Sequence, residues 1–175
     1  MTRTNITADQ NLQAILLELE ASKKEPDRAT LEKLTMYFLQ RLNLEFKLWL
    51  KPDNATHKFE VGAIAEGTFP VFQRWQVLCK HLPSTEISTD DIAERVGLSL
   101  KYKSDVILIV TTGLFQKAAT EFADSIMRGP GLSIITIDRN NLQTLATSPD
   151  AIVDLLESKA KIVASLRNTF FNEQF

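Results

Sequence analysis

The stretch Asp105-Val-Ile-Leu-Ile-Val-Thr-Thr112 constrains the fold of this chain more than any other segment, because it is a nearly continuous run of aliphatic and β-branched residues. A strand of this composition is buried on both faces, as in a sheet that helices cover on both sides. The sequence after it predicts a helix over 113–127, a break at 129–131 and a second buried strand over 132–137. We expect the two strands to be parallel, because a helix connects them.

The residues before this run and after the second strand have other periodicities. Apolar residues at helical spacing predict helices, and strict alternation of apolar and polar residues predicts strands. The further expected elements are helices over 8–20 and 29–42, strands over 44–50, 58–66 and 72–79, a short helix over 88–97 that ends at Gly97, a short helix over 141–146, and a last helix that begins at Ser148 with Pro149 in its first turn.

Together these elements predict an α/β domain with a mixed β-sheet of about five strands flanked by helices. The early strands are expected to pair antiparallel through short loops, and the late strands to be parallel. We expect residues 26–175 to form one compact domain and residues 1–25 to be an N-terminal helical appendage.

Composition excludes several classes of protein. No apolar run approaches the roughly 18 residues that a membrane span needs, so no membrane association is expected. The first residues lack the apolar stretch of a secretory signal, which makes the cytoplasm the expected compartment. Cys79 is the single cysteine, so an intramolecular disulfide and a cysteine-rich zinc site are excluded.

The distribution of charge gives no support for strong nonspecific binding of nucleic acid. The chain has 20 basic and 22 acidic residues, a formal net charge of -2, and a near balance of the two signs in each third. Proteins that neutralise many phosphates usually present a basic face or stripe. In this chain, basic residues from different segments would have to come together on folding to form such a face.

The strand expected over 72–79 and the lysine after it carry the most specific local signal. Side chains alternate between the two faces of a strand, so Arg74, Gln76 and Lys80 project from the face that also carries Leu78. The simplest interpretation is a half-exposed strand with one polar face. Cys79 lies on the opposite face, where a core thiol is expected.

Four segments resemble the Mrr-type nuclease domains of the restriction-endonuclease-like, or PD-(D/E)xK, superfamily. Arg74-Trp-Gln-Val-Leu-Cys-Lys80 is similar to the core motif of that family. The other three similar segments, in the same order as in the family, are Phe59–Glu66, Asp105–Ala123 and Leu132–Leu142. The resemblance covers roughly residues 30–165 and implies the restriction-endonuclease-like fold.

The resemblance also implies a site for metal-dependent hydrolysis of phosphodiesters. Such a site needs a hard divalent cation held by oxygen ligands, which an acid on the second strand and a Glu or Gln on the third supply. A lysine two residues further on positions water and stabilises developing negative charge. In this sequence Gly62 and Leu78 occupy the two ligand positions, and only Lys80 remains. No metal cofactor is therefore expected in the principal interpretation.

Two sets of residues remain as candidates for function. A relocated magnesium site could be built from Glu32, Glu60, Gln76 and Lys80, although solvated charges and a polar strand residue are the ordinary interpretation. In the resembling family the end of the buried strand faces DNA, and helix capping is the ordinary alternative there. The candidate DNA contacts are Arg74, Thr111, Thr112 and Lys117.

Three hypotheses for function follow. The first is a nuclease-superfamily domain that has lost hydrolysis and acts as a DNA-binding or accessory interaction module in DNA processing or restriction. The second is an active Mg²⁺-dependent DNA endonuclease with relocated carboxylates. The third is a structural homodimer or partner-binding protein without DNA contact, which would dock through an exposed apolar patch. Candidates for that patch are Leu12, Ile15, Leu16 and Leu19, or Phe170, Phe171 and Phe175.

Overall fold

Five strands form one mixed sheet in the order β1-β2-β3-β5-β7 in the computed structural model, which describes residues 11–22, 27–50, 59–67, 73–129 and 131–173. The strands are β1 (Leu44–Leu50), β2 (Glu60–Gly67), β3 (Arg74–Lys80), β5 (Val106–Thr111) and β7 (Ser133–Ile137). β1, β2 and β3 pair antiparallel, whereas β3, β5 and β7 pair parallel. The predicted α/β, restriction-endonuclease-like architecture is confirmed.

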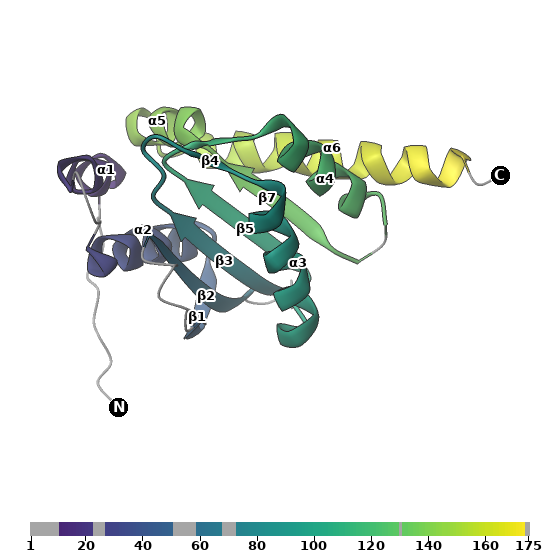
Figure 1. The fold of residues 1–175 in the computed structure, drawn as a ribbon, viewed down its shortest axis with the longest axis horizontal. Helices are drawn as coiled ribbons and strands as arrows, with labels where there is room; N and C mark the ends of the chain where they lie inside the picture. The colour runs from purple at the N-terminus through teal and green to yellow at the C-terminus, as the bar shows by residue number, and fades with distance from the viewer. Residues whose placement is uncertain (1–10, 23–26, 51–58, 68–72, 130, 174–175) are drawn as a thin grey trace.

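Helices cover both faces of this sheet (Figure 1). The first face packs against α1 (Leu12–Ala21), α2 (Arg28–Arg41) and α5 (Arg139–Thr147). The second packs against α3 (Thr89–Tyr102) and α4 (Lys117–Met127). The long α6 (Ala151–Glu173) runs past β7 and contributes apolar side chains to both cores, and its C-terminal part extends beyond the sheet.

The two cores explain why the run in β5 is so apolar. Leu108 and Val110 face the core under α2, and Ile107 and Ile109 face the core under α3 and α4. Every residue of β5 is buried, as the sequence predicts.

Several predicted helix boundaries are wrong. The last helix, expected to begin at Ser148, begins at Ala151, and Ser148 is instead the C-cap of α5. The helix expected from residue 113 begins at Lys117, because β6 (Leu114–Phe115) first pairs in parallel with β4 (Glu86–Ile87). The helix expected to end at Gly97 continues to Tyr102, and Lys103 ends it in the left-handed conformation at φ 53°. Gly97 therefore lies inside the helix, at a cost of about 1 kcal/mol relative to alanine, and Ser99 beyond it is buried.

The first helix is part of the core. Leu12, Ile15 and Leu19 of α1 are buried against α2 and α5, so the prediction that they form an exposed docking patch is wrong. The side chains of Phe170, Phe171 and Phe175 lie outside the described residues, as does the expected boundary between residues 25 and 26. Among the described residues, no helix has both the length and the apolarity to cross a membrane.

Candidate functional site

The register between β2 and β3 places the three positions of the family motif and the relocated candidate Glu60 in two facing pairs. Gly62 lies opposite Leu78, and Glu60 lies opposite Lys80. Partners in an antiparallel pair share a face, so all four positions lie on the side of the sheet that α3 covers. The chemistry of the site therefore depends on which side chains of α3 lie over this face of the sheet.

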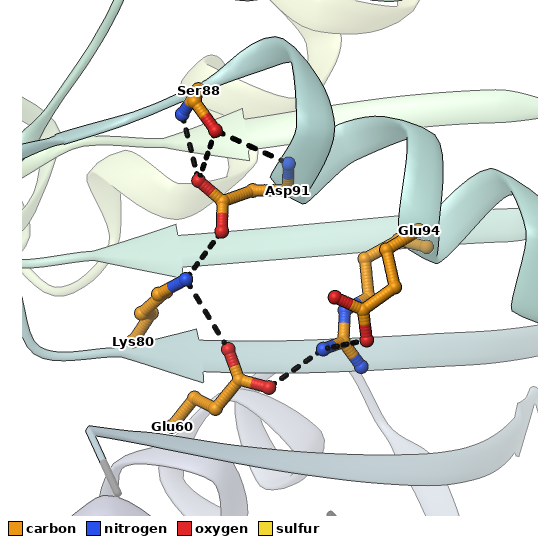
Figure 2. Close-up of polar contacts among 6 residues, drawn as sticks. Glu60, Lys80, Ser88, Asp91 and Glu94 are labelled. Carbon is orange, nitrogen blue, oxygen red and sulfur yellow. Dashed lines mark hydrogen bonds and ion pairs between the residues drawn. The ribbon is translucent and has the colours of Figure 1, made fainter. Parts of the chain in front are cut away.

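The N-terminus of α3 directs a carboxylate at Lys80. Ser88 caps the helix in a capping box with Asp91: the Ser88 backbone N–H and hydroxyl donate to Asp91 Oδ2 at 2.8 and 2.7 Å. The other oxygen of Asp91, Oδ1, accepts a short hydrogen bond from the Lys80 ammonium. Figure 2 shows Lys80 between Asp91 of α3 and Glu60 of β2.

A second cation continues this arrangement. Lys80 Nζ lies 3.4 Å from Glu60 Oε2, and Arg95 of α3 binds the other Glu60 oxygen at 2.6 Å. Arg95 also binds Glu94 at 3.0 Å. The side chains of Glu60, Lys80 and Arg95 are 7%, 15% and 6% exposed. We call these five residues, Glu60, Lys80, Asp91, Glu94 and Arg95, the Lys80 ion network.

The protonation state of Asp91 reflects its position in this network. Burial alone would raise the pKa of its carboxyl. Hydrogen bonds from Lys80 and Ser88 outweigh burial, and the pKa of Asp91 is held below its ordinary value. Asp91 is therefore ionised at neutral pH and neutralises the positive charge of Lys80.

The two positions that the resemblance assigns to metal ligands are apolar. Leu78 is fully buried, and a Cβ at Gly62 would lie 3.1 Å from Leu50 Cδ1. The nearest carboxylates, Glu60 and Asp91, bind Lys80 and Arg95. No group of three His, Cys, Asp or Glu side chains suited to a metal occurs among the described residues. The residues present do not fit the divalent cation that the fold family implies.

Gln76 differs from its prediction. It is fully buried on the α3 face of β3, between Ile64 and Ile107 in the neighbouring strands. Its side-chain oxygen and nitrogen have no hydrogen-bond partner within the part of the chain that the structure describes. The predicted half-exposed polar face of this strand is therefore wrong, because α3 covers Gln76 and Leu78.

Glu32 does not join the site. It lies on α2, which packs on the opposite face of the sheet through Leu31, Leu34 and Phe38. Its carboxylate binds Arg28 at 2.8 Å, one turn earlier in the same helix. Of the predicted relocated set, the structure brings only Glu60 and Lys80 into contact.

The predicted DNA contacts are spread over the molecule. Arg74 lies at the opposite end of β3 from Lys80, six residues or roughly 20 Å away, and binds Glu66 at 2.8 Å. Thr111 is buried and accepts the Gly113 N–H at 3.0 Å, which supports its interpretation as a local cap. Lys117 is 90% exposed and lies 3.6 Å from Glu121. Thr112 accepts the Leu82 N–H at 3.0 Å, so the two threonines lie beside the Lys80 end of β3, far from Arg74.

Asp91 and Arg95 belong to the site although no pattern in the sequence predicts them as site residues. The spacing from Ser88 to Asp91 is a capping signal, and a helix start is predicted there. The capping interaction accounts for the hydrogen bonds that Asp91 Oδ2 accepts, and it does not predict a partner for Oδ1. The contact with Lys80 arises only when α3 is laid across the sheet.

The family model Mrr_cat, described as a restriction endonuclease, matches residues 24–146, which is more than half of the chain. The chain belongs to this restriction endonuclease family. The matched span of the Mrr_cat domain includes all strands of the sheet and every member of the Lys80 ion network. A search of curated proteins found no match.

Proposed function

We propose that this Mrr_cat domain does not hydrolyse phosphodiesters and acts as a DNA-binding or accessory interaction module. One observation carries the proposal: the lysine that remains from the family motif is bound by two carboxylates, Glu60 and Asp91. The neighbouring ligand positions hold Gly62 and Leu78, which supply no side-chain oxygen.

The environment of Lys80 supports the loss of hydrolysis. A lysine that stabilises developing negative charge must direct a free positive charge at the reacting group. Here the Lys80 charge is neutralised, and α3 covers the site with Asp91 and Arg95. Removing one partner of a buried ion pair costs about 3–5 kcal/mol, so the network favours the closed arrangement.

A weak contact with DNA is supported at the other end of β3. Two adjoining clefts of about 330 and 400 Å³ lie there. Their basic lining residues are Lys47, Arg74, Lys101 and Lys103. Lys101 and Lys103 are exposed and have no carboxylate within 4 Å among the described residues, whereas Arg74 and Lys47 bind Glu66. Two lysines without a carboxylate partner in the described structure, next to cations that are already paired, favour modest, salt-sensitive binding of DNA phosphates.

The active-nuclease alternative keeps one supporting observation, which is that Glu60 lies beside Lys80. To bind a cation, Glu60 would have to exchange Arg95 and Lys80 for the metal. The alternative of a partner-binding homodimer without DNA contact predicts no change of DNA mobility and a doubled mass in solution.

The test combines metal titration with two DNA assays. Calorimetry with Mg²⁺ and Mn²⁺, run beside cleavage of supercoiled plasmid, is expected to show neither binding nor nicking. Fluorescence anisotropy with a labelled duplex at low salt is expected to show weak binding that Lys101→Gln/Lys103→Gln reduces. The matched control is Arg128→Gln/Lys161→Gln, which removes two exposed cations elsewhere. Metal-dependent nicking that disappears in Lys80→Ala would establish the active-nuclease alternative.

A further inference from the structure

A cleft of about 630 Å³ lies at the carboxyl ends of the parallel strands. Its walls come from α1, the segment after β3, the end of β5 and the start of α5. It is separate from the Lys80 ion network and from the clefts around Arg74, with which it shares no lining residue. The volume lies within the range of about 300–1,000 Å³ that small-molecule sites usually have.

The topology of the sheet favours a ligand at this place. The chain leaves β5 towards α4, which covers the second face, and leaves the adjacent β7 towards α5, which covers the first. The connections after two neighbouring parallel strands therefore diverge. In open α/β sheets, ligands bind in the crevice that such divergence opens outside the carboxyl ends of the strands.

Arg139 supplies a fixed positive charge to the cleft. It is the first residue of α5, and its guanidinium donates to the backbone oxygens of Thr112 and Pro83 at 2.7 and 2.8 Å. Neither acceptor carries a formal charge, and no carboxylate lies within 4 Å of Arg139 in the described ranges. The cation is held in place without a counter-ion, which suits a ligand with an anionic group.

His81 is a further lining residue of the cleft. The ring is 4% exposed, and its Nδ1 lies 2.9 Å from the Thr112 hydroxyl. Burial lowers the pKa of His81, the charge of Arg139 lowers it further, and the charge of Glu20 on α1 raises it. Arg139 of α5 and Glu20 of α1 line this cleft together with His81.

The remaining lining defines the rest of the ligand. Leu16 of α1 and Leu142 of α5 add apolar side chains to the lining. With His81 neutral, one guanidinium and one carboxylate leave the described lining residues with no net charge. A net-neutral ligand with charges of both signs fits these walls better than a dianion such as a phosphate monoester.

We propose that this cleft binds a small zwitterionic amino-carboxylate, such as a free amino acid with an apolar side chain. Its carboxylate binds Arg139, its ammonium group faces Glu20, and its apolar part lies between Leu16 and Leu142. The proposal does not depend on whether the domain hydrolyses or binds DNA.

The test follows the imidazole signal of His81 by NMR while apolar L-amino acids, leucine and phenylalanine among them, are titrated into the full chain. The chain has two histidines, so a His57→Gln variant assigns the signal. We expect a saturable shift with at least one amino acid, and none with the matching amino-acid amide or with adenosine monophosphate. Failure of every apolar amino acid, or binding of adenosine monophosphate instead, would overturn the proposal.

Two variants locate the site. Arg139→Gln is expected to weaken binding by at least about tenfold, the loss typical of a charge-assisted hydrogen bond. Because Arg139 also joins two loops, Gln143→Trp provides a second test: it fills the cleft from an exposed position of α5 and should abolish binding in a folded protein. Thr144→Trp, at the next exposed position, should bind as the wild type does. Wild-type binding by Gln143→Trp, or loss of binding by Thr144→Trp, would place any binding elsewhere.

Discussion

Glu60 lies directly opposite Lys80 in the antiparallel pair β2–β3, with 3.4 Å between the ammonium nitrogen and the carboxylate. The same carboxylate binds Arg95 at 2.6 Å. The lysine that the family resemblance assigns to catalysis is therefore paired with two carboxylates, Glu60 and Asp91, in this chain. Because Glu60 neutralises two cations at once, its removal should lower the free energy of unfolding more than removal of any other member of the network.

Glu60→Gln should lower the free energy of unfolding by about 3 kcal/mol or more, since it leaves Lys80 and Arg95 nearly buried without their shared carboxylate. Urea denaturation followed by circular dichroism measures the change. The matched control is Glu86→Gln, an exposed carboxylate with expected change within about 0.5 kcal/mol. Equal effects of the two variants would mean that the network contributes little.

Stability should fall in acid through Asp91. Its folded-state pKa lies below the ordinary value of 3.8. Its contribution is therefore complete above the unfolded pKa and is lost as the pH falls through the folded one. Unfolding free energies measured across this acidic range should decline less steeply in Asp91→Asn than in the wild type. The matched control is Asp90→Asn, which removes an exposed carboxylate from the same first turn of α3.

Gln76→Leu should stabilise the protein by about 1–3 kcal/mol, because it replaces a buried amide without hydrogen-bond partners in the described structure by a side chain that matches Ile64 and Ile107. Thermal and urea unfolding both report the gain. The control Gln143→Leu changes the same residue type at an exposed position and should be nearly neutral. A loss of stability in Gln76→Leu would reveal a polar partner of this amide, such as a buried water.

Gly62→Asp should not restore metal-dependent cleavage and should destabilise the domain by several kcal/mol. Its carboxylate would be buried against Leu50 and Leu78, and the neighbouring cations Lys80 and Arg95 already bind Glu60 and Asp91. Gly97→Asp provides the control, because a side chain at that helical position meets nothing within 4 Å. Plasmid nicking and urea denaturation are measured on both variants, and Mg²⁺-dependent nicking by Gly62→Asp would contradict this expectation.

Cys79 should resist thiol reagents in the folded protein. The thiol is fully buried, and burial raises its pKa to about 12, so the reactive thiolate is absent at neutral pH. Labelling with a chromogenic disulfide should be complete in urea and very slow in buffer. Since this is the single cysteine, the signal is unambiguous. Fast labelling in buffer would show that the sheet opens locally at β3.

The sequence alone determined the architecture and the identity of the altered positions. The apolar run in β5, the alternation in β1 and the helical spacing in α2 are local patterns, and each predicts its element because burial on one or two faces dictates periodicity. Gly62, Leu78 and Lys80 were likewise found from a motif that spans a few residues of two strands.

Only the tertiary structure decided what surrounds those positions. Asp91 and Arg95 reach the face of β2 and β3 because α3 crosses the sheet there, and the same crossing buries Gln76. The periodicity of one segment predicts which side of that segment is buried. It does not predict which residue of a distant helix packs on that side. The partner of Lys80, the burial of Gln76 and the cleft at Arg139 depend on contacts between segments far apart in the chain.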